Sequence, residues 1–140
     1  MKNFKYIIAL FTLIGFTSCS NDNETYATNG ETIFRTGINI HGTVLQDISQ
    51  SEIKKVHGCA NCHGDNGKGK FRGGGDKQTG SITYYDLTNT SIYTPVYNDD
   101  LIKRFIDSET KSDNTHANTG VVYVMKETDK IDLINFLKTL

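Results

Sequence analysis

The stretch of sequence that decides the fold is Cys59-Ala60-Asn61-Cys62-His63, in which two cysteines stand three positions apart and a histidine follows the second. Residues three apart in a helix lie on the same side, so both sulfur atoms would face one bound group. Because the chain has only 3 cysteines and 4 histidines in 140 residues, this pattern would arise by chance in about two of a thousand such chains. The motif therefore indicates the chemical centre of the protein.

This motif resembles the haem-attachment sequence of c-type cytochromes. In that family both cysteines form thioether bonds to the vinyl groups of one haem, and the histidine binds the iron. The resemblance implies that Cys59 and Cys62 hold one covalent haem c and that His63 is an axial ligand of its iron. Residues 64–69 strengthen it, because they resemble the G-x-x-G-x-G turn that follows the haem histidine in class I (monohaem) cytochromes c.

A thioredoxin-like thiol pair is one alternative for these cysteines, but it needs a strand before the first cysteine. Residues 49–52 instead form a capping box, Ser-Gln-Ser-Glu, and Ile53, Val56 and Ala60 follow at helical spacing. The sequence therefore predicts a helix that the two cysteines close.

A zinc site is a second alternative, and it needs another pair of ligands near the cysteines. The remaining histidines, His41, His57 and His116, are scattered along the chain. A structural disulfide between Cys59 and Cys62 is a third alternative, and it would close a ring too small to add much stability. Haem attachment is the preferred interpretation.

The hydrogen-bond partner of His63 is not identified by the sequence. Class I cytochromes usually have a proline after the glycine turn, and its backbone carbonyl accepts the N–H of the axial histidine. The only proline in this chain is Pro95, so we expect another backbone carbonyl to take this role. Residues 71–77 are glycine-rich but lack the ending and the preceding strand of a phosphate-binding loop, which predicts a surface loop.

Met125 is predicted to be the second axial ligand, because haem iron in an electron carrier is usually bound on both faces. It is the only methionine besides Met1, and it stands just before a predicted C-terminal helix, where class I cytochromes carry their axial methionine. Lys126 follows it, whereas the family usually has a proline there that stiffens the loop. This departure from the family pattern implies an iron–sulfur bond that is weaker than usual in the family.

Other histidines are alternatives to Met125 as the iron ligand. His116 ranks first, because it lies in a long polar segment before Met125, and His41 ranks second. His57 stands two residues before Cys59 and would not reach the opposite face of the haem.

Helical patterns predict a mainly α fold. The resemblance to cytochromes c implies that three or more helices wrap around one haem. Asn98 is predicted to cap a helix that ends near Ser108. The apolar stripe of this helix is Leu101, Ile102, Phe105 and Ile106. We expect that stripe to be core.

A C-terminal helix is predicted from Thr128, its proposed N-cap, with Asp129 and Asp132 near its positive end. Its apolar face is Ile131, Leu133, Ile134, Phe136, Leu137 and Leu140. Residues 132–140 resemble the closing pattern D-L-x-x-[YF]-L-x-x-L of the cytochrome family.

The segments between these helices give weaker signals. Residues 32–46 contain two short apolar runs around a turn signal at residues 39–42, which predicts an extended arm or small hairpin. Four tyrosines gather in the central segment, and we expect them to pack rather than to bind haem propionates. They are Tyr84, Tyr85, Tyr93 and Tyr97.

The N-terminus predicts export and a lipid anchor. Residues 1–5 are positively charged, residues 6–16 are uncharged and mostly apolar, and two small residues precede Cys19. The apolar run is shorter than the roughly twenty residues that span a bilayer. The boundary resembles a bacterial lipoprotein cleavage site, which implies a signal peptide at residues 1–18 and a lipid on Cys19. Plain secretion with Cys19 left as a thiol is the alternative.

This interpretation divides the chain into three parts. After the signal peptide, residues 19–31 are the lipidated cysteine and a polar tether, and residues 32–140 are the cytochrome c domain. The net charge of −1 becomes −3 once Lys2 and Lys5 leave with the signal peptide. This balance gives no electrostatic case for binding nucleic acid.

The resemblances together imply a lipid-anchored electron-transfer protein rather than an enzyme. It would pass one electron between extracytoplasmic partners such as an oxidase, a reductase or a dehydrogenase, on the periplasm-facing or outer surface of a bacterial membrane. A subunit of a dehydrogenase complex would play the same physical role. The alternative is a haem sensor or peroxidase-type enzyme whose sixth iron position is open or bound by histidine.

Overall fold

The computed structural model describes residues 26–47, 56–70 and 79–140. The predicted signal peptide, Cys19, the capping box at residues 49–52 and the loop at residues 71–77 lie outside these ranges. Among the described residues the elements are α1 (Asn29–Thr36), α2 (Cys59–His63), α3 (Tyr84–Leu87), α4 (Asp99–Ser108) and α5 (Glu127–Leu137). None of these helices combines the length and the apolar character that crossing a membrane requires.

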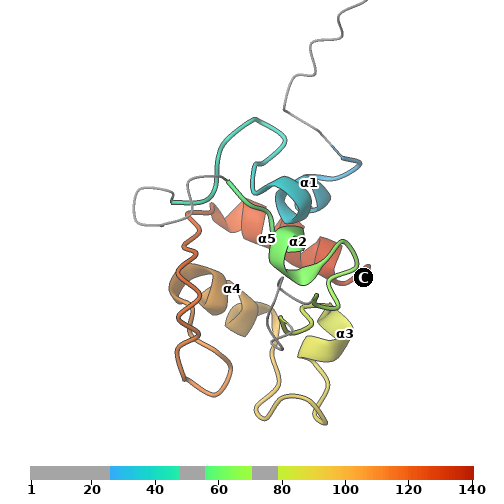
Figure 1. Ribbon diagram of the computed structural model, residues 1–140, viewed down its shortest axis with the longest axis vertical. Helices are drawn as coiled ribbons and strands as arrows, with labels where there is room; N and C mark the ends of the chain where they lie inside the picture. Colours follow the sequence, from blue (N-terminus) through green and yellow to red (C-terminus); the bar gives the residue numbers. More distant parts are fainter. Residues whose placement is uncertain (1–25, 48–55, 71–78) are drawn as a thin grey trace, which may run out of the picture.

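The described part of the chain is mainly helical, as predicted. Its β pairing is limited to isolated antiparallel bridges, which join Ile38 to Val44, Gln46 to Tyr123 and Thr110 to His116. Helix α1 packs on both α5 and α2, and α4 packs on α5. Helix α3 is drawn below α2 (Figure 1), and the Tyr84 hydroxyl joins it to Asp99 at the start of α4. The short α2 is therefore held to the C-terminal helix through α1.

Helix α1 corrects the prediction of an extended arm beginning at residue 32. Thr28 caps it by accepting the Glu31 N–H at 3.1 Å, and Gly37 ends it in the left-handed conformation at φ 75°. Its first turn also lies inside the predicted tether. The chain folds here because the helix buries Ile33 and Phe34, which are 1% and 0% exposed, so packing overrides a polar-looking N-terminal turn.

The turn predicted at residues 39–42 is present after α1. The Gly42 N–H donates to the Asn39 carbonyl at 2.8 Å, and the Asn39 N–H donates to the Thr43 carbonyl at 3.0 Å. With the bridge between Ile38 and Val44, these bonds form the hairpin part of the prediction. The prediction for residues 32–46 is therefore right in its second half only.

Helix α4 agrees with its prediction at both ends. The Asn98 side chain accepts the Leu101 N–H at 2.8 Å, and the last helical residue is Ser108. Within its apolar stripe Ile102 is buried, and Leu101, Phe105 and Ile106 pack against the core. The local cap and the stripe were sufficient signals here.

Helix α5 exists as predicted but begins earlier than its predicted cap. Lys126 is the N-cap, so Thr128 lies within the first turn instead of preceding it. Glu127 and Asp129 also stand in this turn, where negative charge favours a helix start. On the apolar face Leu133, Ile134 and Leu137 are buried, whereas Ile131 is 42% exposed.

Helix α2 is shorter than predicted, because it begins at Cys59 and Val56–Gly58 are not helical. Two contacts hold these residues out of a helix. The His57 N–H donates to Gln46 Oε1 at 2.8 Å, and a Cβ on Gly58 would lie 2.4 Å from the Phe34 carbonyl oxygen. The helix therefore begins at Cys59 and packs on α1, whereas the prediction was a longer helix that ends with the cysteines.

Candidate functional site

The cysteine–histidine motif coincides with α2. Cys59 and Cys62 stand one turn apart and therefore on the same side of the helix, and each is half-buried. Ala60 turns into the core and is 6% exposed. Since Cys59 is the first residue of α2 and His63 is the last, the motif places two sulfur atoms and one imidazole ring along one short helix.

The glycine turn predicted after the histidine is present. The Gly64 N–H donates to the Ala60 carbonyl at 2.8 Å, and the Gly69 N–H returns to the His63 carbonyl at 2.8 Å. Gly64 and Gly69 adopt φ values of 77° and 87°, which other residues rarely adopt. The turn thus satisfies the carbonyl groups at the end of α2 and brings residue 69 back against the histidine.

The His63 ring is oriented by a backbone carbonyl, as expected. Its Nδ1 lies 2.7 Å from the Gly80 carbonyl oxygen. A carbonyl oxygen can only accept a hydrogen bond, so Nδ1 carries the hydrogen and Nε2 carries the lone pair with which histidine binds a metal. Gly80 therefore fills the position for which the sequence offered no proline.

The environment of Cys59 disfavours thiolate chemistry. Burial raises the pKa of its thiol to about 12, and the neighbouring Cys62 adds to this effect. A thioredoxin-like site and a zinc site both use the thiolate, and reactive cysteines have lowered pKa values. Among the described residues no group of three or more His, Cys, Asp or Glu side chains is placed to hold a metal ion. Cys59 is therefore a protonated thiol near neutral pH.

Tyr123 is a site residue that the sequence analysis missed. Its hydroxyl donates to the His57 carbonyl at 2.8 Å, and burial together with the charges of Cys59 and Cys62 raises its pKa. Tyr123 therefore stands beside both cysteines. Its signal in the sequence is a strand-like alternation, because Tyr123 and Met125 share one face of an extended segment and Val124 points the other way.

Met125 lies on the same face as Tyr123 and is buried. It is 9% exposed, whereas Val124 is 68% exposed. The segment is fixed by the Val124 N–H, which donates to the Leu45 carbonyl at 2.6 Å. Met125 thus belongs to the core cluster against which Cys59 packs.

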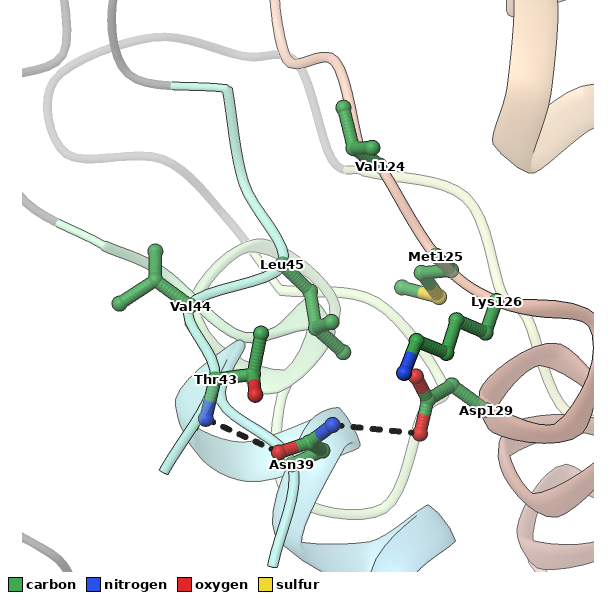
Figure 2. Close-up of a pocket in the computed structure, with 8 residues that line it drawn as sticks. All are labelled: Asn39, Thr43, Val44, Leu45, Val124, Met125, Lys126 and Asp129. Atoms are coloured by element: carbon green, nitrogen blue, oxygen red, sulfur yellow. Dashed lines mark hydrogen bonds between the residues drawn. The ribbon is translucent and has the colours of Figure 1, made fainter. Parts of the chain in front are cut away.

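A hollow of about 310 Å³ adjoins Met125. Figure 2 shows the side chains of Met125 and Leu45 directed toward each other across it, with Asp129 at its base. Its lining residues are Asn39, Thr43, Val44, Leu45, Val124, Met125, Lys126 and Asp129. Cys59, Cys62 and His63 are not among them, so the hollow adjoins the methionine without being lined by the motif.

The alternative histidine ligands lie in more exposed surroundings. His41 is exposed on the turn after α1. The His116 side chain is 54% exposed, with Nδ1 3.7 Å from the Glu109 carboxylate, and it also accepts the Asn118 N–H at 3.3 Å. His57 is held next to Cys59 by its backbone contacts to Gln46 and Tyr123. Among these four candidates, Met125 alone is buried.

Three of the four central tyrosines pack, as expected, and the expectation is wrong for Tyr85. Tyr93 and Tyr97 stack edge to face with ring centres 5.2 Å apart, and Tyr84 donates its hydroxyl to Asp99 at 2.9 Å. Tyr85 is 76% exposed.

A set of half-buried apolar side chains, called the apolar wall below, packs against the core cluster that contains Met125. Half-buried apolar side chains from several segments pack on the core without being enclosed by it. They include Ile82, Tyr84, Tyr93, Leu101, Phe105, Ile106 and Tyr123. Covering the remaining apolar surface of these side chains would stabilise the fold. Comparison of the chain with protein-family models, with curated proteins and with solved structures finds no match.

Proposed function

We propose that this protein is a single-haem electron carrier with a class I cytochrome c fold. The observation that carries the proposal is the hydrogen bond from His63 Nδ1 to the Gly80 carbonyl, at the end of a helix that holds both motif cysteines. This bond selects the tautomer of His63 in which Nε2 binds a metal. An iron-binding histidine uses that tautomer, so the hydrogen bond supports the assignment of His63 as an iron ligand.

The chain's own residues divide the work of holding the group. Cys59 and Cys62 would bind haem through thioether bonds, which use neutral sulfur and fit the raised pKa of Cys59. His63 and Met125 would bind the iron from opposite faces. The haem supplies an iron that gains and loses one electron. If His63 and Met125 both bind the iron, they would leave no position on it for substrate, which suits a carrier rather than an enzyme.

The proposal includes location and partners. Lipidation of Cys19 would attach the mature chain to a bacterial membrane on its extracytoplasmic side, and the polar segment after it would serve as a tether. The partners would be redox proteins, one donor and one acceptor, of the oxidase, reductase or dehydrogenase classes.

The full chain, produced in a host that attaches haem to exported proteins, tests both parts. A pyridine haemochrome spectrum is expected to show one c-type haem per chain. Intact-mass analysis is expected to show peptide 19–140 plus acyl chains plus one haem. A colourless protein whose mass lacks haem would contradict the proposed function, and haem without acyl chains would contradict only the anchor.

The hollow beside Met125 favours a second candidate function, that of a haem sensor or peroxidase-type enzyme. It gives the methionine room to leave the iron, and Lys126 replaces the proline that would stiffen this loop. An iron without a sulfur ligand would bind small molecules such as peroxide.

Replacing Met125 by alanine distinguishes the two functions. In the carrier, ferric haem bound by His63 and Met125 has a weak near-infrared sulfur-to-iron band, and Met125→Ala is expected to abolish it. The same change is expected to lower the reduction potential by on the order of 100 mV, because a methionine ligand favours the ferrous state. Optical spectra and redox titration measure both effects.

Val124→Ala is the matched control, because Val124 is the exposed neighbour of Met125 in the same segment. It is expected to leave the band and the reduction potential unchanged. A wild-type protein that lacks the band, and whose spectrum Met125→Ala does not alter, would instead support the sensor or peroxidase function.

A further inference from the structure

Two adjacent residues bind the end of α2 from the same side. The Thr79 hydroxyl lies 2.5 Å from the Cys62 carbonyl oxygen, and the Gly80 carbonyl accepts the hydrogen bond from His63 Nδ1 at 2.7 Å. The dipeptide of Thr79 and Gly80 therefore contacts both the second cysteine and the histidine, and each contact spans seventeen positions of the chain.

The Thr79 hydroxyl donates its hydrogen bond to the Cys62 carbonyl rather than to the Lys70 carbonyl. A hydroxyl donates a single hydrogen bond, and both Cys62 and Lys70 offer a carbonyl oxygen, at 2.5 Å and 3.1 Å. The Lys70 carbonyl already accepts the Thr79 N–H at 3.1 Å, and the Lys70 N–H donates to the Thr79 hydroxyl oxygen at 3.0 Å. The shorter contact and this pairing direct the proton to Cys62, whose carbonyl is at a helix end.

The Thr79 backbone is also fixed from the glycine turn. A Cβ on Gly69 would lie 2.0 Å from the Thr79 carbonyl oxygen, so the two backbones touch. Gly69 in turn donates its N–H to the His63 carbonyl at 2.8 Å. Thr79 thus lies between the end of α2 and the turn that follows it, directly before the carbonyl that orients the histidine ring.

We infer that Thr79 is a positioning residue, whose hydroxyl bond to Cys62 sets the Gly80 carbonyl against His63 and thereby tunes the iron. This role rests on the proposed haem function. A strong hydrogen bond from Nδ1 makes the imidazole a better electron donor, which favours ferric iron. If the Thr79 hydroxyl is lost, the Gly80 carbonyl is held less firmly, the bond weakens, and the reduction potential rises.

Thr79→Val tests the inference, because valine has the shape of threonine without the hydroxyl. The equilibrium constant for one-electron exchange with a reference mediator is expected to change threefold to tenfold toward ferrous haem. At 59 mV per tenfold this is a rise of about 30 to 60 mV. Thr79→Ser keeps the hydroxyl and is expected to restore the wild-type potential. Thr79→Ala provides a second variant without the hydroxyl, in case the branched side chain of valine disturbs folding.

Thr88→Val is the matched control. The Thr88 hydroxyl donates to the Tyr84 carbonyl at 2.9 Å at the end of α3, so the variant removes the same kind of bond from another helix. Its reduction potential is expected to equal that of the wild type.

Haem content, measured by pyridine haemochrome for every variant, separates the role of Thr79 from the proposed function. A wild-type chain without haem overturns the proposed function and, with it, this role of Thr79. Haem-bound Val and Ala variants with an unshifted potential overturn the role of Thr79 alone. A shift in both variants that Thr79→Ser does not show supports it.

Discussion

The double variant Cys59→Ala/Cys62→Ala is expected to emerge without covalently bound haem and to lose most of its far-ultraviolet helical signal. The motif cysteines are the only covalent link proposed between the cofactor and the chain. The apolar wall that includes Ile82, Leu101 and Phe105 is half-buried without it, so the haem would contribute a large part of the apolar contact area of the folded state. Circular dichroism and a pyridine haemochrome spectrum measure the two losses.

Asn61→Ala is the control for that experiment, because Asn61 is the exposed residue between the cysteines. This variant is expected to keep one haem and the wild-type helical signal. A double alanine variant that retained native helicity would show that the polypeptide core suffices without haem. That result would contradict the proposed contribution of the apolar wall to folding around the cofactor.

Local signals predicted the second half of the fold well. Asn98 and the stripe after it specify α4 because the cap and the apolar spacing lie within one stretch of sequence. The start of α5 was less well defined. Lys126 is the N-cap but its side chain makes no capping hydrogen bond, so its residue type does not indicate the helix start. Thr128 is a residue type that often caps helices, but here it lies in the first turn.

Contacts between distant segments account for the helices that were misjudged. Helix α1 contains a glycine and a polar first turn, and its stability comes from burying Phe34 against α5. The predicted helix through Val56 is interrupted because Gly58 packs against the backbone of α1. The contact of α1 with α5 and the contact of Gly58 with α1 both join distant segments, so no local sequence pattern predicts them.

The candidate site shows the same division. Its chemistry could be predicted from residue types, because cysteines and a histidine at this spacing are rare. The partner of His63 could not, since Gly80 contributes only a backbone carbonyl and stands seventeen residues away. Tyr123 could have been predicted, because the alternation of side chains along this extended segment places Tyr123 and Met125 on the same face.

The crossing of α1 and α5 gives the second large effect. A Cβ on Gly30 would lie 2.0 Å from the backbone oxygen of Asp132, so no side chain fits between the two helices at this point. Two further contacts join the helices near Gly30. The Asn29 side chain donates to Asp132 at 2.8 Å and to Asp129 at 3.1 Å. The Phe34 and Phe136 rings pack with their centres 5.1 Å apart.

Gly30→Ala is therefore expected to lower the free energy of unfolding by about 2 kcal/mol or more. This sign is informative, because alanine in a helix is otherwise about 1 kcal/mol more favourable than glycine. Urea denaturation of the haem-bound protein, followed by circular dichroism, gives the value. Gly42→Ala is the control: Gly42 has open space around its Cβ position but a φ of 76°, so it is expected to cost only about 1 kcal/mol. A Gly30→Ala protein as stable as the wild type would mean that α1 and α5 separate without cost, and the close crossing would then not be what holds α2 in place.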